Sequence, residues 1–215
     1  MNKAADPPRQ RLKPEVRRES LLQAAASVFA ERGYEAARIE QVADAAEVSP
    51  GLLYRHFAGK KELYSEVLQR ADAELLEHMA AAAAPGQPSH SRLEHGVDAV
   101  LAFIEEHPVL WQLLVRDVVD PEIKALRDAT YAHAVSVVAV QLELDPEFQR
   151  QGFSGQEAER MAAVIVGATT AMADWWTNHS GTTREEVLAT IMSVMWLGFD
   201  RMRAGERYQV DLTRE

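Results

Sequence analysis

The chain has 215 residues, of which 47% are hydrophobic and 26% charged, and it contains no cysteine. This composition is typical of a globular protein with enough chain for one or two domains, and it excludes disulfide scaffolds, zinc–thiolate sites and thiol catalysis. The first residues lack the apolar segment of a secretory signal, and the longest apolar run, residues 161–173, is too short to cross a bilayer. We therefore expect a cytoplasmic protein with no membrane partner.

The net charge of −10 is divided unevenly along the chain. Residues 1–70 carry 12 Lys and Arg against 10 Asp and Glu, whereas residues 71–215 carry 11 against 23. A basic end on an acidic body is typical of a protein in which one small part meets phosphate. The alternative is a basic leader, residues 1–14, that has no partner.

The apolar residues follow a helical period nearly everywhere, without alternating strand patterns or internal repeats, and this predicts an all-α fold. Helices are expected over residues 16–32, 39–46, 49–57, 60–84, 92–106, 108–119, 121–144, 156–178 and 183–204. Gly33 is placed to end the first helix, and the segment PGQPS at residues 85–89 is the clearest break. We expect a flexible basic leader over residues 1–14, a small helical domain over 15–60, and a larger helical domain over 61–215.

The second and third helices have the dimensions of a helix-turn-helix, and they are too short to be stable without the first helix as a platform. Val48 is an apolar residue in the turn between them. Ser49 is a favourable N-cap, and Pro50 follows at the first helical position. Leu53 and Phe57, four residues apart, are expected to face the platform.

The remaining positions of the third helix fall on its outer or flanking faces: Pro50, Gly51, Leu52, Tyr54, Arg55 and His56. An exposed phenol, guanidinium and imidazole suit phosphate oxygens and base edges in a major groove. Lys60 and Lys61 begin the next helix, where their charge opposes the helix dipole. A phosphate partner would explain them, and a solvated pair of lysines is the alternative.

The segment between Leu22 and Leu63 resembles the amino-terminal domain of the TetR family of bacterial transcriptional regulators. The elements that agree in order and spacing are Phe29, Gly33, Val42-Ala43, Ala46, Val48-Ser49, Gly51, Leu53-Tyr54, His56-Phe57, Lys60 and Leu63. The remaining residues resemble this family only in being helical, because the ligand-binding bodies of its members differ widely.

The resemblance implies roles for individual residues at a double-stranded DNA operator. It assigns backbone contacts to Ser49, Tyr54, His56 and Lys60, and base-edge positions to Gly51, Leu52 and Arg55, with Arg38 and Gln41 contributing from the second helix. Two positions depart from the family pattern. Arg38 stands where Thr or Ser caps the second helix, and Glu47 stands where Gly adopts a left-handed turn, at a cost on the order of 1 kcal/mol.

The last two helices are apolar on more than one face, which predicts burial on more than one side. The resemblance implies that they form a four-helix dimer seam, and a central position in a monomeric core is the alternative. The residues that we expect in the seam are Val164, Ala168, Ala171, Ile191, Met195, Trp196 and Phe199. A homodimer with twofold symmetry would present two recognition helices about 34 Å apart.

Aromatic, apolar and charged residues of the body are candidates for an effector pocket, although core packing is the alternative for each of them. They are Phe103, Trp111, Arg116, Tyr131, Met172, Asp174, Trp175 and Trp176. Arg116 and Asp174 stand out because a charge among apolar residues needs a partner.

The spacing of the seven histidines does not suggest a metal site, and neither a phosphate-binding glycine loop nor a nucleophile–base pair is evident. We expect no cofactor, no metal and no enzymatic activity. The sequence indicates a dimeric repressor that binds a pseudo-palindromic operator and is released by a small apolar or aromatic effector. A dimeric regulator without an effector, an activator and, more remotely, an enzyme are the alternatives.

Overall fold

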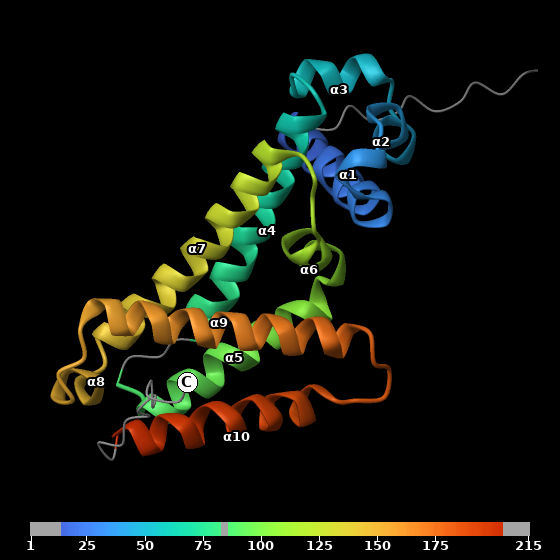
Figure 1. Cartoon of the computed structure of the whole chain (residues 1–215). Coiled ribbons are helices and arrows are strands. Elements are labelled where there is room, and N and C mark those ends of the chain that lie inside the picture. Colours follow the sequence, from blue (N-terminus) through green and yellow to red (C-terminus); the bar gives the residue numbers. More distant parts are fainter. Residues whose placement is uncertain (1–13, 83–85, 204–215) are drawn as a thin grey trace, which may run out of the picture. The chain divides into compact units, whose positions relative to one another are not determined.

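The computed structural model describes residues 14–82 and 86–203, and within these ranges the protein is all-α, as predicted (Figure 1). Apart from Pro14, the predicted leader lies outside the described residues. The helices are α1 (Pro14–Ala36), α2 (Ile39–Ala45), α3 (Pro50–His56), α4 (Lys60–Ala82), α5 (Ser89–Glu106), α6 (Pro108–Val115), α7 (Pro121–Glu143), α8 (Pro146–Arg150), α9 (Gly155–Thr177) and α10 (Arg184–Arg203).

The chain divides into two compact units, and the boundary lies inside α4, between Val67 and Leu68. The prediction placed this boundary after Lys60. The first turns of α4 belong to the first unit because Leu63, Tyr64 and Val67 are 0–1% exposed in its core. The apolar core of the first unit thus includes side chains from the first turns of α4.

The core of the first unit is built around three aromatic rings from α1 and α4. The Tyr64 ring meets those of Phe29 and Tyr34 edge-on, with centroids 4.8 Å and 5.0 Å apart. Such pairs contribute about 0.5–1.5 kcal/mol beyond the area that they bury. Val42 and Ala43 of α2 are completely buried in this unit, so the two short helices depend on the longer ones for stability.

Gly33 interrupts α1 as predicted. Its φ of 78° and ψ of 164° lie in a region that only glycine adopts without strain, and the last residues of α1 follow this break. The chain thereby changes direction before α2 begins at Ile39.

The turn between α2 and α3 contains a left-handed residue at the predicted position. Glu47 has a φ of 54° and is the only non-glycine residue with positive φ in the described part of the chain. The next residue, Val48, donates its backbone N–H to the carbonyl of Ala43 at 2.9 Å, which closes the turn.

The core of the second unit is formed by α5, α6, α9 and α10, and Figure 1 shows α9 and α10 running alongside α5. Its buried members are Val97, Leu101, Phe103, Ile104, Trp111, Ile165, Ala173, Val187, Ile191 and Met195. A second, smaller cluster joins α7 to α9 through Val135, Ala139 and Ala162. None of the helices within residues 14–82 and 86–203 has the length and apolarity of a membrane span.

Two elements of the second unit differ from the prediction. The sixth helix ends at Val115 rather than at residue 119. The reason is that the Asp120 carboxylate caps α7 by accepting the N–H groups of Glu122 and Ile123, which requires the preceding residues to be extended. The short helix α8 was not predicted, because its five residues are too few to show a period.

Candidate functional site

Helix α3 is held by its inner face and presents a polar outer face. Leu53 and Phe57 are 1% and 2% exposed, as predicted for residues that face the platform. Tyr54 is 54% exposed, Arg55 is also exposed, and a Cβ built on Gly51 would have open space around it. Among the predicted DNA contacts, the exposed residues are Arg38, Ser49, Pro50, Gly51, Tyr54 and Arg55, and the half-buried ones are Gln41, Leu52, His56 and Lys60.

Ser49 occupies the predicted N-cap position, but its hydroxyl does not cap the helix. Its backbone carbonyl accepts the N–H of Leu52 at 2.9 Å, and Pro50 follows at the first helical position. The exposed hydroxyl can therefore donate to a phosphate oxygen without loosening the start of α3.

Helix α2 begins with only half of a capping box, formed by Gln41 and the backbone of Arg38. The Gln41 side-chain oxygen accepts the backbone N–H of Arg38 at 2.9 Å, which is one half of a capping box. A guanidinium has no acceptor, so Arg38 cannot supply the other half. Gln41 thus stabilises α2, and the exposed Arg38 guanidinium extends from the end of the helix.

Lys60 is a correction to the predicted phosphate contacts. Its Nζ donates to the backbone carbonyls of Tyr34, Glu35 and Ala37 at 2.7, 3.2 and 3.1 Å, and it lies 4.5 Å from the centre of the Tyr34 ring. An ammonium has three donors, and all three are used here. The charge at the start of α4 is thus balanced by backbone carbonyls at the end of α1 and just after it.

Arg18 was counted only as part of the basic amino-terminal charge, but it has a structural role. Its guanidinium lies 4.7 Å from the centre of the Phe57 ring and forms an ion pair with Glu66 of α4. Phe57 is the C-cap residue of α3, so its contact with Arg18 stabilises the end of the recognition helix. The sequence gives no signal for this contact, since the three residues are far apart along the chain.

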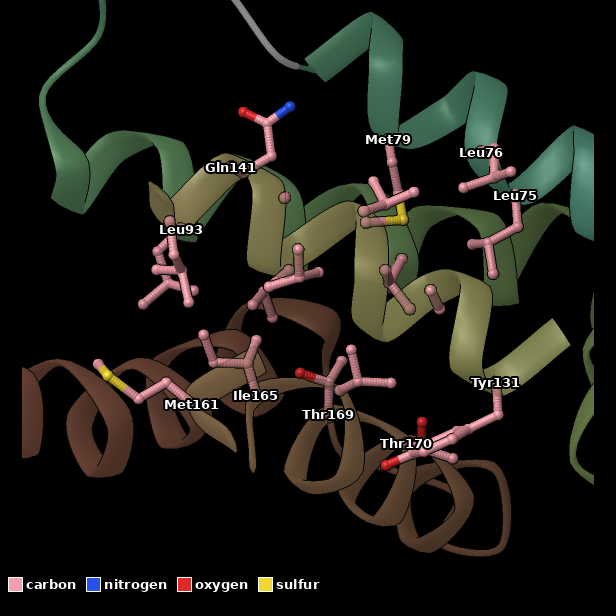
Figure 2. Close-up of a pocket in the computed structure, with 18 of the residues that line it drawn as sticks. Leu75, Leu76, Met79, Leu93, Tyr131, Gln141, Met161, Ile165, Thr169 and Thr170 are labelled. Atoms are coloured by element: carbon pink, nitrogen blue, oxygen red, sulfur yellow. The ribbon is translucent and has the colours of Figure 1, made fainter. Parts of the chain in front are cut away.

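The second unit encloses a cavity of about 500 Å³, which is in the range of small-molecule sites (Figure 2). Its main walls come from α4, α5, α7 and α9. Figure 2 shows Leu75 and Met79 of α4 across the cavity from Ile165 and Thr169 of α9. Most of the lining side chains are apolar, so the interior favours a largely apolar molecule.

Two polar atoms in the cavity lining have no hydrogen-bond partner among the described residues. They are Nε1 of Trp111 and the hydroxyl oxygen of Thr169, and both are buried. An unsatisfied buried polar group costs about 1–3 kcal/mol. Both residues line the cavity, but their unpaired atoms are not accessible to water, so a bound molecule would reach them only after the wall rearranges.

An ion pair also lies in the cavity lining. The Asp145 carboxylate is 5% exposed, and it accepts hydrogen bonds from the Arg92 guanidinium, the Ser89 hydroxyl and, at 3.3 Å, the N–H of Phe148. These partners compensate the burial of its charge. The charged pair that lines the cavity is therefore Arg92 and Asp145, whereas the predicted pocket residues Arg116 and Asp174 do not line it.

Of the eight predicted pocket residues, only Trp111 and Tyr131 line this cavity. Phe103, Met172 and Trp176 belong to the core of the second unit or pack against it. Arg116, Asp174 and Trp175 are exposed, and the Trp175 ring stacks on His179 with centroids 4.1 Å apart. Neighbouring residues of one helix point in different directions, and only the packed structure shows which direction meets the cavity.

The predicted seam residues of α9 lie on its outer surface. Val164 is 63% exposed, and Ala168 and Ala171 are exposed at positions four and seven residues further along the helix. They form one stripe, as residues at this spacing do on a helix. The side chain of Phe199, also predicted in the seam, lies outside the described part of the chain.

The predicted seam residues of α10 are a correction, because they face the interior of their own unit. Ile191 and Met195 are 4% and 6% exposed in its core, and Trp196 lines the cavity. The exposed apolar residues of α10 are instead Val194 and Leu197, at 73% and 64%. A helix with two apolar stripes does not reveal by period alone which stripe faces outward.

A helix-turn-helix with a polar recognition helix, followed by a separate all-helical body, defines a class of DNA-binding regulators. Two matches to known protein families support this class. Residues 21–67 match the family of bacterial regulatory proteins called tetR, and residues 88–198 match the tetracyclin repressor-like C-terminal domain.

Individual proteins show the same relationship. The chain is 33% identical to the HTH-type transcriptional activator FasR of Mycolicibacterium smegmatis over 172 residues, 79% of this chain and 76% of FasR. It is 44% identical to the HTH-type transcriptional repressor KstR2 of the same organism over 66 residues, 31% of each chain. A solved TetR-like regulator from Rhodococcus sp. RHA1 covers 88% of this chain and 99% of its own, with a TM-score of 0.74 and 26% identity.

This chain belongs to the TetR family of transcriptional regulators. The relatives and the fold are those of regulators and not of enzymes.

Proposed function

We propose that this regulator binds a pseudo-palindromic DNA operator as a homodimer and releases it when a small molecule enters the cavity of the second unit. The observation that carries the effector proposal is the cavity of about 500 Å³ whose lining includes two unsatisfied buried polar atoms. A protein that acts on operators in this way works in the cytoplasm.

On the DNA side, the proposal uses the outer face of α3 and the start of α2. Ser49, Tyr54 and His56 contact phosphates. Gly51, Leu52 and Arg55 lie nearest to base edges, with Arg38 and Gln41 as contributors, and Pro50 lies beside them on the DNA-facing side. This division is supported by the buried inner face of α3, which leaves Tyr54 and Arg55 exposed. A guanidinium is the side chain that most often reads guanine, and a phenol hydroxyl suits a phosphate oxygen.

On the effector side, the lining favours a molecule with an apolar body and one or two polar groups. Apolar side chains, most often leucine and valine, supply most of the wall. The Trp111 N–H can only donate, whereas the Thr169 hydroxyl can donate or accept. An effector that reaches Trp111 after a rearrangement of the wall would carry an acceptor, such as a carbonyl or hydroxyl oxygen.

The dimer is proposed to form through the exposed apolar residues of α9 and α10. Val164, Ala168 and Ala171 supply one stripe, and Val194 and Leu197 supply the other. Exposed apolar side chains in such a group mark an interface. A twofold dimer presents its two recognition helices to half-sites about 34 Å apart.

Helix α4 is the element through which the effector acts. It runs without a break from Lys60 to Ala82, with Leu63, Tyr64 and Val67 in the core of the first unit and Leu75, Leu76 and Met79 at the cavity. A molecule that fills the cavity shifts α4 and thereby changes the spacing of the two α3 helices. By linkage, DNA weakens effector binding by the same factor.

Repression by occupancy of the operator is the mode that we propose first. Activation is the second candidate, because the relative that aligns over 76% of its length, FasR, is named as an activator. A reporter gene separates the two modes. Deletion of the regulator raises expression if it represses and lowers expression if it activates.

The test of the central proposal has two steps. A thermal-shift screen of apolar carbonyl compounds identifies a ligand that stabilises the protein, and fluorescence anisotropy then measures operator affinity with and without it. We expect at least tenfold weaker DNA binding in the presence of the ligand. Equal affinities would reject the switch, and a stable operator complex that no cavity ligand alters would support a regulator without an effector.

A further inference from the structure

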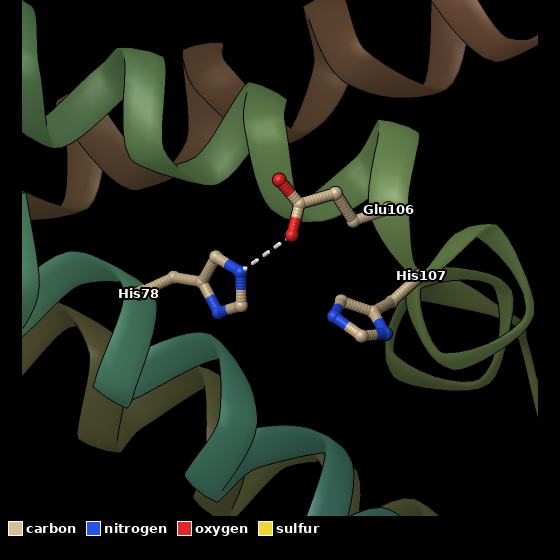
Figure 3. A group of neighbouring side chains, drawn as sticks. All are labelled: His78, Glu106 and His107. Atoms are coloured by element: carbon tan, nitrogen blue, oxygen red, sulfur yellow. Dashed lines mark hydrogen bonds and ion pairs between the residues drawn. The ribbon is translucent and has the colours of Figure 1, made fainter.

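We propose that His78, Glu106 and His107 form a binding site for a divalent transition-metal ion, with Zn²⁺ as the reference ion. His78 lies on α4, Glu106 ends α5, and His107 follows it, and each offers one ligand atom within 4.8 Å of the others (Figure 3). All three belong to the second unit, and the site is separate from the cavity lining. The proposal does not depend on the regulatory mechanism above.

The distances fit a metal ion closely at one pair and need a small adjustment at the third ligand. With metal–ligand bonds of about 2.0–2.1 Å, two ligand atoms of a tetrahedral ion lie about 3.3 Å apart. Nε2 of His78 and Oε2 of Glu106 are 3.2 Å apart. The His107 ring stands nearly perpendicular to that of His78, at 84°, with centroids 5.4 Å apart, and its ligand atom lies within 4.8 Å of the other two. Binding would therefore require the His107 side chain to move closer, to about 3.3 Å.

A hydrogen bond behind His78 and a carboxylate near His107 orient the two imidazoles as metal ligands. Nδ1 of His78 lies 2.9 Å from the backbone carbonyl of Glu74, and because a carbonyl only accepts, this nitrogen carries the hydrogen. Nε2 faces the Glu106 carboxylate, and a metal ion bound between them would replace the hydrogen of this contact. The Glu74 carboxylate lies 3.8 Å from Nδ1 of His107 and is held by Nε of Arg70 at 2.7 Å. A carboxylate or carbonyl behind the imidazole is the usual support of a metal-bound histidine.

One side of the site packs against a buried aromatic ring, and the other side is open to solvent. The Phe103 ring, which is completely buried, packs against both imidazoles with centroids 5.4 Å and 5.1 Å away. Glu106 is exposed and the two histidines are half-buried, so an ion can enter from solvent.

The ligand types select the kind of ion. Two imidazoles and one carboxylate suit Zn²⁺ and similar borderline ions, whereas Mg²⁺ and Ca²⁺ prefer oxygen ligands. Three protein ligands leave at least one position for water. The histidine spacing did not suggest this site because His78 and His107 come from different helices, and only the fold brings them together.

The test uses the full-length protein after treatment with a chelator. Zn²⁺ is titrated in competition with a chromophoric chelator, and Co²⁺ is used to read the coordination from its visible absorption. We expect one ion per chain and a Co²⁺ spectrum typical of four or five ligands. His78→Ala, His107→Ala and Glu106→Gln are each expected to weaken Zn²⁺ binding at least tenfold.

Two histidines outside the site serve as matched controls. His95→Ala and His179→Ala are expected to leave Zn²⁺ affinity and the Co²⁺ spectrum unchanged. Glu106→Gln alters an exposed side chain, so it tests the site without disturbing the core. Melting curves of all three variants without metal show whether each one keeps its fold. Absence of stoichiometric Zn²⁺ binding, or binding that Glu106→Gln and His107→Ala leave intact, would overturn the proposal.

Discussion

Glu47 shows how a single residue can oppose the conformation that its position requires. The turn between α2 and α3 holds it at a φ of 54°, in the left-handed region where a Cβ is unfavourable. Glu47→Gly is therefore expected to raise the free energy of unfolding by about 0.5–1 kcal/mol. Urea denaturation followed by circular dichroism measures this change. Glu40→Gly, inside the regular helix α2, is the control and is expected to destabilise the protein.

Lys60 is the residue whose predicted role the structure revises. Its ammonium satisfies three backbone carbonyls, so Lys60→Ala is expected to lower the free energy of unfolding by about 1–3 kcal/mol. The neighbouring Lys61→Ala, at an exposed position, is expected to change it by less than about 0.5 kcal/mol. Denaturation curves of both variants test the difference. A Lys60→Ala variant of unchanged stability whose DNA binding depends less on salt would restore the phosphate role.

At the scale of the element, we propose that α3 makes two kinds of DNA contact with one face. Tyr54→Phe is expected to weaken binding to all DNA sequences alike, by about 0.5–1.5 kcal/mol, because a phosphate contact carries no sequence information. Arg55→Ala is expected to reduce discrimination at one base pair of each half-site by about 1–3 kcal/mol. Binding to a library of operator variants measures both effects. An unchanged base preference in Arg55→Ala would remove that residue from base readout.

Helix α9 contains a buried polar atom, the hydroxyl oxygen of Thr169, in a residue that lines the cavity. Thr169→Val has nearly the same volume but lacks the hydroxyl that has no partner among the described residues. Its free energy of unfolding is expected to rise by about 1 kcal/mol, because an unsatisfied buried group is removed. Thermal unfolding without ligand measures this. A clear loss of stability would mean that the hydroxyl already has a hydrogen-bond partner in solution.

The order of the helices and the place of the DNA-reading element were predictable because they depend on local patterns. Pro50 at the first position of α3, Gly33 at the break in α1 and Glu47 in the left-handed turn were each expected where the structure has them. The end of α6 was not, because it is set by the capping of the next helix by Asp120. Such competition between neighbouring elements has no simple period in the sequence.

At the scale of the whole molecule, the proposed homodimer depends on the outer stripes of α9 and α10. Val164→Glu and Leu197→Glu place charge on residues that are 63% and 64% exposed in one chain, so each is expected to leave the chain folded. Each is also expected to weaken dimerisation at least tenfold, since an unpaired charge at an interface is costly. Analytical ultracentrifugation measures the dissociation constant. Val140→Glu, at a 49% exposed valine of α7, is the control.

The sequence by itself determined an all-α fold, a helix-turn-helix and the outward face of its recognition helix. These features follow from hydrophobic period, capping residues and glycines, which act within a few residues of the chain. Only the tertiary structure decided which aromatic residues meet the cavity, which apolar stripe of α10 is buried, and that Lys60 binds carbonyls. It also decided that His78 lies beside Glu106 and His107. These outcomes depend on contacts between helices that are distant in sequence, and a helical period carries no information about which neighbour each face will meet.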